Sequence, residues 1–347
     1  MYDSAVLASI FDRVTSRRAA VLAVLAAMTL AGAATSGRAA SGGCGMEGCP
    51  LETRGPASAS SRFSFDLAYQ VTDQDQLWNG SSEGTLGPTN AHTVDLATRT
   101  RAWVGAGRAR ITDWLAFNGS LAWFDRSHTQ LYQHHTNFFV PYSWNYSGLG
   151  DLMLTGSFLP FTAFGGPPIG LAVLAGVKLP TGDSHVTPVG GFEPEPAVRL
   201  GTGSTDALVG LQVSHPFSAP TLRHESGSVP LTVGATYAYA GKGTDGYRTG
   251  REYQLSLDTG YPLLQSVRVV GQMSASLHGT DDVGISAAAP HHSGGTTLLA
   301  TPGLRVQLGP SLTTYAYYQH RVYQHTNGLE AVAPSHWLIG TSYALGH

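Results

Sequence analysis

Residues Ile169–Asp183 read IGLAVLAGVKLPTGD, and the fold can be inferred from this stretch. Every second residue from its start is apolar (Ile, Leu, Val, Ala, Val and Leu), whereas the residues between them are Gly, Ala, Leu, Gly and Lys178. Successive side chains of a β-strand point to opposite faces, so one face is apolar and the other is small with one charge. Pro180 and Gly182 end the strand, because Pro lacks an amide donor and Gly frees the backbone. We interpret the stretch as one strand of a barrel that faces lipid outside and a polar lumen inside.

The composition of the chain agrees with this interpretation. Charged residues make up 12% of the 347 residues, whereas a soluble protein carries about a quarter. The mean hydropathy is only −0.04, which excludes a helical membrane protein but suits a barrel, because alternation averages the apolar and polar faces. The net charge of −3 at pH 7 argues against a nucleic-acid partner.

Twelve segments carry the same alternation, and we expect each to be a strand. The connections after odd-numbered segments are mostly long and polar, and those after even-numbered segments are mostly short, as in outer-membrane barrels. A soluble sandwich would also alternate, but it needs large aliphatic residues on a shared inner face, where this chain carries charges and Gly. The sequence therefore predicts an all-β fold, a transmembrane antiparallel up-and-down β-barrel of about 12 strands within residues 62–347. The expected strands are 62–72, 92–106, 114–124, 148–158, 169–179, 205–215, 231–241, 252–262, 267–278, 297–308, 312–323 and 336–345.

The first 40 residues are expected to be a cleaved signal peptide. Arg17 and Arg18 precede the apolar run Ala19–Ala34, and small residues follow it. The run is short for a membrane anchor, so an export signal is favoured. Residues 41–61 are expected to form a linker, in which Cys44 and Cys49 form a small disulfide loop in an exported protein. The alternative is a soft-metal site made by the two thiolates and a neighbouring Met.

The strand parity also predicts which polar side chains face the lumen. Their charges have both signs, which favours a paired network over a channel of single sign, and a barrel of this size has a narrow interior. We therefore expect a narrow or gated pore. The lumen-facing candidates are Asp66, Asp95, Arg99, Arg101, Asn118, Asp151, Lys178, Gln212, Glu252, Asp258, Arg268, Gln272 and Arg305.

Four Gly-rich motifs follow one another between residues 148 and 252. Their Gly and short polar residues would let the expected loop 181–203 fold inward, so the motifs can be architectural as well as functional. The motif residues are Gly148, Gly150, Asp151, Lys178, Pro180, Thr181, Gly182, Asp183, Gly201, Gly203, Asp206, Gly246, Tyr247 and Gly250.

In this order, the four motifs resemble those of the outer-membrane proteins named after the meta-pathway of phenol degradation. The resemblance covers residues 148–261, and Thr249 stands where Pro is common in that family. It implies a barrel that carries small, often aromatic, hydrophobic compounds inward. We expect such solutes to be captured by aromatic residues in and just before the expected outside loop 125–147, although these residues would also suit an interfacial girdle. They are Trp123, Phe124, Tyr132, Phe138, Phe139, Tyr142 and Trp144.

Two alternatives remain open at this stage: a copper- or zinc-related transporter and a plugged structural barrel. Histidine is frequent, and His134-His135 and His291-His292 lie in expected outside loops. Adjacent residues of an extended strand point apart, however, so these pairs are poor chelators and we predict no metal site. No nucleophile and base can be paired either, so we expect neither an enzyme nor a cofactor.

The expected location is the bacterial outer membrane. The partners would be the lipid bilayer, a small hydrophobic solute and the barrel assembly machinery. Residues 336–345 alternate as a closing strand that carries an assembly signal should, although the chain finishes in His347 rather than in an aromatic residue. Tyr and Trp residues near many strand ends would form the girdles at the two membrane interfaces.

Overall fold

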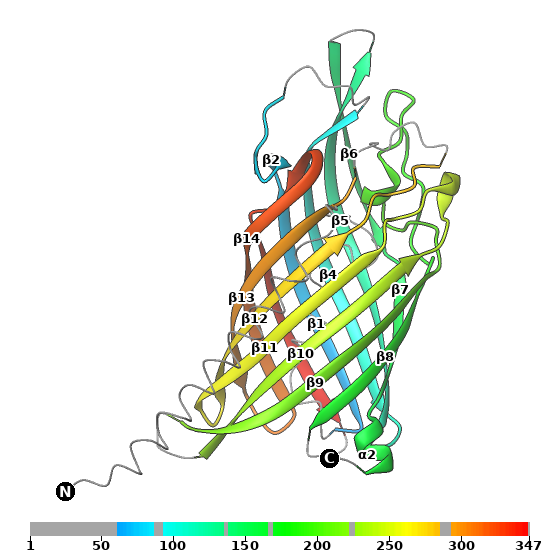
Figure 1. Ribbon diagram of the computed structural model, residues 1–347. Helices are drawn as coiled ribbons and strands as arrows, with labels where there is room; N and C mark the ends of the chain where they lie inside the picture. Colours follow the sequence, from blue (N-terminus) through cyan, green and yellow to red (C-terminus); the bar gives the residue numbers. More distant parts are fainter. Residues whose placement is uncertain are drawn as a thin grey trace, which may run out of the picture. The chain divides into compact units, whose positions relative to one another are not determined.

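The computed structural model describes residues 61–86, 93–134, 138–165, 169–221, 226–284 and 293–345, and most of them lie in strands (Figure 1). The expected signal peptide and disulfide fall outside the described residues. The strands are β1 (Phe63–Gln74), β2 (Gln76–Gly80), β3 (Ser82–Glu83), β4 (Thr93–Arg110), β5 (Leu115–His134), β6 (Phe138–Leu149), β7 (Leu152–Phe158), β8 (Gly170–Leu179), β9 (Asp206–Pro220), β10 (Ser226–Ala240), β11 (Glu252–Leu264), β12 (Val267–His278), β13 (Gly295–Gln307), β14 (Leu312–Val332) and β15 (Ser335–Leu345).

These strands form one closed antiparallel barrel. From β7 to β15 each strand pairs with the next one in the sequence, β4 pairs with β5, and β1 pairs with both β4 and β15. β6 and β7 pair with successive parts of β5 and together make one strand of the wall. β2 and β3 pair with each other, and β2 pairs with the far end of β14; neither is part of the wall. The wall therefore has 12 strands, and the predicted fold class is confirmed. A short helix, α2 (Pro160–Phe164), lies in the turn between β7 and β8. No helix in the described part of the chain is long and apolar enough to cross a membrane.

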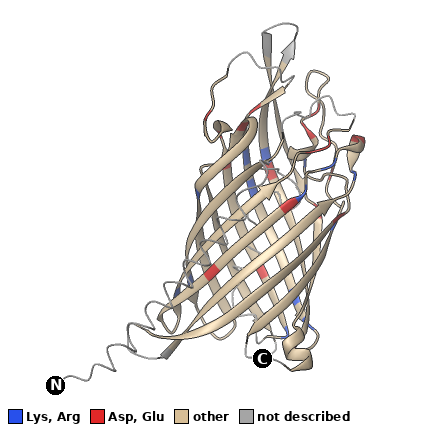
Figure 2. Cartoon of the chain, in the orientation of Figure 1, with Lys and Arg blue, Asp and Glu red and all other residues tan. Residues whose placement is uncertain are grey.

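The two faces of the wall follow the predicted parity. On β9, Val209 and Leu211 are more than half exposed on the outer face, whereas Leu208 and Gln212 line a cavity inside. Most of each strand carries no charge (Figure 2). A structure that spans a bilayer needs an apolar outer face and paired backbone groups, and a closed barrel with this outer face provides both.

Several strands are longer than predicted. The expected loop 125–147 is largely the paired extension of β5 and β6. The connection 215–230, long for a turn, is mostly the ends of β9 and β10, and β14 continues to Val332. These extensions carry polar and aromatic residues on both faces, because a strand beyond the bilayer needs no apolar face. Their composition therefore resembles that of a loop.

A β-bulge lies between β6 and β7. From the pair Trp123–Leu149 to the pair Ser120–Met153, β5 advances by three residues and the opposite chain by four. The extra residue reverses the parity, so both Gly150 and Asp151 are buried on the inner side. In an uninterrupted strand, Asp151 would share the outward face of Leu149. Bulges commonly re-aim a side chain in this way.

Candidate functional site: a loop folded into the lumen

The connection between β8 and β9, residues 180–205 (the β8–β9 loop), folds into the barrel. Residues 194–200 are all buried. Leu200 packs against Ala102, Val104 and Phe124, which lie on the inner faces of β4 and β5. A loop lying outside the barrel could not reach these side chains, so the β8–β9 loop narrows the lumen.

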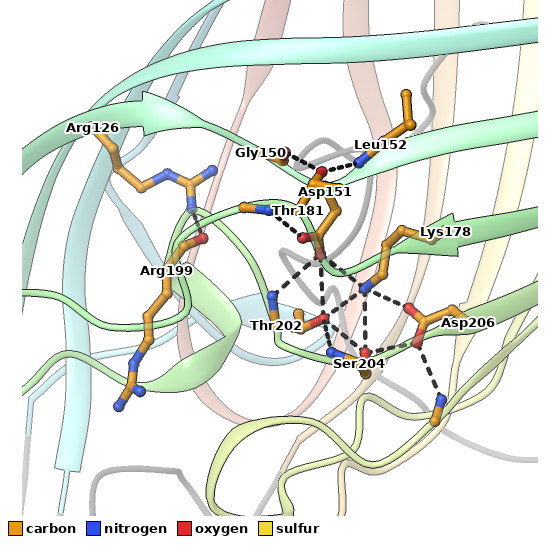
Figure 3. A network of polar contacts seen from close by, with 12 residues as sticks. Arg126, Gly150, Asp151, Leu152, Lys178, Thr181, Arg199, Thr202, Ser204 and Asp206 are labelled. Carbon is orange, nitrogen blue, oxygen red and sulfur yellow. Dashed lines mark hydrogen bonds and ion pairs between the residues drawn. The ribbon is translucent and has the colours of Figure 1, made fainter.

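Lys178, at the end of β8, lies at the centre of a network that pins the base of this loop (Figure 3). Its side chain is 1% exposed. Its ammonium lies 2.5 Å from Asp206 Oδ2 and 3.4 Å from Asp151 Oδ2, and it donates to Thr202 Oγ1 at 2.6 Å and Ser204 Oγ at 3.4 Å. A buried charge needs this degree of pairing and hydrogen bonding to be tolerated.

Both carboxylates of the network also accept backbone hydrogens from loops. Asp151 Oδ1 accepts from Gly182 N at 3.0 Å, and its Oδ2 accepts from Thr202 N at 3.3 Å. Asp206 Oδ1 accepts from Gly241 N at 3.1 Å. The bulge that turns Asp151 inward is therefore what ties both ends of the β8–β9 loop to the wall.

Glycines allow the backbones in this region to approach closely. A Cβ on Gly182 would lie 2.9 Å from Gly150 C and from Leu200 O, and one on Gly201 would lie 2.6 Å from Gly182 O. Real Cβ atoms do not approach backbone atoms so closely, so a larger residue at either position requires the backbone to move.

We expect Gly182→Ala to destabilise the barrel by about 1–3 kcal/mol, the usual range for overpacking. Gly309→Ala is the matched control, because a Cβ there meets nothing within 4 Å. The measurement is the temperature at which the folded barrel loses its compact mobility in a detergent gel. Equal temperatures for the two variants would show that Gly182 is not tightly packed.

A second anchor, on β5 and β6, holds the middle of the β8–β9 loop. Arg126, on the inner face of β5, donates to the carbonyls of Val198 and Arg199 and to Thr100 Oγ1. Tyr146 on β6 also donates to Val198 O. The guanidinium is a rigid fork of donors, which suits it to holding loop carbonyls in place.

Aromatic side chains meet the outer part of the loop. Tyr132, Tyr142 and Trp144 from β5 and β6 surround Phe192, with ring centroids of contacting pairs 4.5–6.5 Å apart. Tyr132 donates to Glu193 O at 2.9 Å and Trp144 to Phe192 O at 3.3 Å. We call these four residues the aromatic cluster. The side chains of Phe138 and Phe139, also expected to capture solute, lie outside those described.

The fourth motif packs against the same loop. Tyr247 is 2% exposed, packs against Ala197 and donates to Asp281 Oδ2 at 2.8 Å. Asp281 Oδ1 accepts from Gly250 N at 2.7 Å. Gly203 has a φ of +71°, which favours glycine. Residues from all four motifs thus gather around the β8–β9 loop.

Nine of the 13 predicted lumen residues fall into two groups. Asp151 and Lys178 lie in the network, and Asp66, Asn118, Gln212, Asp258, Arg268, Gln272 and Arg305 line a cavity of about 450 Å³. Asp95 lies 3.6 Å from the buried His128, and Glu252 pairs in register with His278, which is buried.

The prediction for Arg99 and Arg101 is wrong. Both side chains are at least half exposed on the outer face, where Arg99 pairs with Asp73 and Arg101 with Asp125. The cause is a register shift between Asp95 and Ala97, which reverses the parity within β4. The sequence carries no clear sign of this irregularity.

Sequence reasoning missed several inward-facing charged residues, among them Arg108, Arg126 and Arg199. Arg108 lines the cavity just beyond the expected end of its strand. Continuing the alternation of segment 114–124 would have placed Arg126 inside. The parity predicted for segment 92–106 would have placed Arg108 outside, because the register shift between Asp95 and Ala97 reverses that parity. Arg199 belongs to the loop, where no periodicity exists to place it. Within the described residues, no group of three or more His, Cys, Asp or Glu could hold a metal ion.

Comparisons with known proteins support the fold. No protein-family model matches the chain, and no curated protein sequence matches it significantly. Its structure is similar to that of an outer membrane channel from Pseudomonas putida, with a TM-score of 0.55 at 12% identity, over 86% of this chain and 100% of the other. A Pseudomonas aeruginosa FadL homologue gives a TM-score of 0.44 at 10% identity, over 90% and 99% of the two chains. At 12% identity the first likeness shows the fold, which is that of an outer-membrane barrel.

Proposed function

We propose that the chain is an outer-membrane channel that admits small aromatic or other hydrophobic compounds through a narrow lumen. The observation that carries this proposal is the β8–β9 loop, which is held inside the barrel by two separate sets of buried polar contacts. A pore with a wide, open lumen passes hydrophilic solutes largely by size. A narrow one selects solutes by shape and surface chemistry.

The aromatic cluster supports the choice of solute. Its rings lie where the outer extension of β5 and β6 meets the β8–β9 loop. Flat aromatic solutes make the same offset or edge contacts as these rings make with one another. A solute of this kind can therefore replace contacts between the rings while the loop moves, which a sugar or an ion cannot do as well. The resemblance of the four motifs to the phenol meta-pathway family implies the same class of solute.

The test compares uptake by intact cells that lack or carry the protein. We expect the initial rate of uptake of labelled phenol or toluene to fall several-fold without the protein and to be restored by the wild-type chain. Copper and zinc uptake in the same cells tests the metal-related alternative. Equal rates for every solute in both strains would contradict a transport role and favour a plugged structural barrel.

A further inference from the structure

We propose that the cavity at the short-turn end of the barrel binds the carboxylate of a small organic anion. Three arginines would supply the charge: Arg108 on β4, Arg268 on β12 and Arg305 on β13. The inference deepens the proposed function, on which it rests, because it assigns an acidic group to the solute. The cavity of about 450 Å³ lies within the usual size range of small-molecule sites.

The charge balance of the cavity favours an anion. Its charged lining residues are these three arginines and the carboxylates Asp66 and Asp258. Two carboxylates can neutralise at most two guanidinium groups, so one positive charge is left in a partly enclosed space. In a low-dielectric surrounding such an excess charge strongly favours a bound counter-ion.

Two of the arginines lie opposite each other, an arrangement that a bound anion would stabilise. Arg268 and Arg305 are direct cross-strand partners, and both line the same cavity. Like charges opposite each other on one face of a sheet repel. A carboxylate between or beside them would remove this repulsion, because it can bind a guanidinium through two parallel hydrogen bonds.

The contacts of these two arginines orient them without neutralising them. Arg268 donates to Ser228 O at 3.0 Å and Gly260 O at 3.1 Å, and its side chain crosses the inner face of Gly260, where a Cβ would lie 2.8 Å from its Cδ. Arg305 donates from Nε to Tyr317 Oη. The acceptors are neutral, and each guanidinium keeps further N–H donors for a ligand.

Arg108 and Gln272 hold polar atoms that no described residue satisfies. Arg108 lies on β4, which is the fourth strand round the wall from β13, so it reaches the cavity from a different side than Arg268 and Arg305. Its buried Nε has no hydrogen-bond partner in the described part of the chain. Gln272 is 5% exposed and lines the same cavity, and its Oε1 likewise lacks a described partner. Buried polar atoms are nearly always satisfied, so each marks a place for a ligand atom or water. A donor on the ligand, such as a hydroxyl, would suit the amide oxygen.

The test measures binding to the purified full chain in detergent, using 4-hydroxybenzoate and its methyl ester as probes. The ester keeps the ring and the hydroxyl but removes the charge. We expect the acid to bind at least about tenfold more tightly than the ester, in line with the strength of a charge-assisted bidentate contact. The advantage should shrink as salt rises from low to high concentration. Inorganic phosphate that competes as well as the acid would contradict a carboxylate site.

The variants place the site. Arg108→Gln should remove most of the preference for the acid and leave binding of the ester unchanged, whereas Arg108→Lys should keep part of it. Arg101→Gln, on the outer face, is the matched control and should bind as the wild type does. If Arg108→Gln fails to fold, Arg268→Gln serves in its place. A preference for the acid that survives loss of the arginine would overturn the proposal. Binding without cellular uptake contradicts only the proposed transport, and uptake without binding contradicts only this site.

Discussion

Replacing Lys178 with Met should destabilise the barrel by about 3–5 kcal/mol, the usual loss when one partner of a buried ion pair is removed. The Lys178 ammonium is the cation within 4 Å of both Asp151 and Asp206. Met has a similar length and no charge, so both carboxylates would stay buried without the positive charge that pairs with them. The same change should free the β8–β9 loop, because Asp151 holds its backbone at Gly182 and Thr202 and Asp206 accepts from the Ser204 hydroxyl.

Two measurements check this prediction. Stability is measured by urea unfolding in lipid vesicles, and release of the loop by trypsin. Trypsin should cut after Arg199 in the variant alone, because this residue is buried in the wild type. Arg101→Met is the control, because it removes an exposed cation from the outer face. Asp151→Asn and Asp206→Asn, added to Lys178→Met, should recover part of the stability. A stable, protease-resistant Lys178→Met barrel would show that the network does not hold the loop.

The second large effect concerns the wall itself. Leu211→Lys should destabilise the barrel in a bilayer by about 2–4 kcal/mol, the range found for Lys on the lipid face near the membrane centre. Leu211 is 55% exposed on the outer face of β9. In the fold it would have lipid around it and no polar partner. The next residue, Gln212, lines the cavity inside, so Gln212→Lys should cost much less.

The matched pair is compared by folding into vesicles over a range of urea concentrations. The two variants add the same side chain to neighbouring positions of one strand, so strand propensity and expression are controlled. The expected order is a large loss for Leu211→Lys and a small one for Gln212→Lys. An equal loss, or the reverse order, would show that the outer and inner faces have been exchanged.

Parity made most of the fold predictable. A strand that alternates strictly, such as β8, shows in its own sequence which face meets lipid. The number of strands and the antiparallel order follow from counting such segments and their connections. Parity fails where an extra residue enters a strand, as near Leu96 and at Gly150, because a bulge depends on tertiary contacts rather than on composition. The two outer-facing arginines of β4 were misplaced for this reason.

The site was predictable only in part. Lys178 stood out because it is the one charge in an otherwise apolar and small-residue stretch. Gly182 and Gly201 signalled close approach of backbones. Which segments approach each other could not be derived from spacing, because the contacts join residues far apart in the sequence. The anchoring role of Arg126 was hidden by the long strand extensions, whose mixed composition resembles that of a loop.

The central claim is that the β8–β9 loop narrows the lumen and sets the width of the pathway. It is tested most directly by the single-channel conductance of the wild-type chain in planar bilayers, beside a variant in which residues 184–199 are replaced by a short Gly-Ser linker. This variant keeps Lys178, Thr202 and Asp206. The account predicts a small wild-type conductance and a several-fold larger one for the variant. A large, steady, unselective wild-type current, or equal conductance in both, would contradict it.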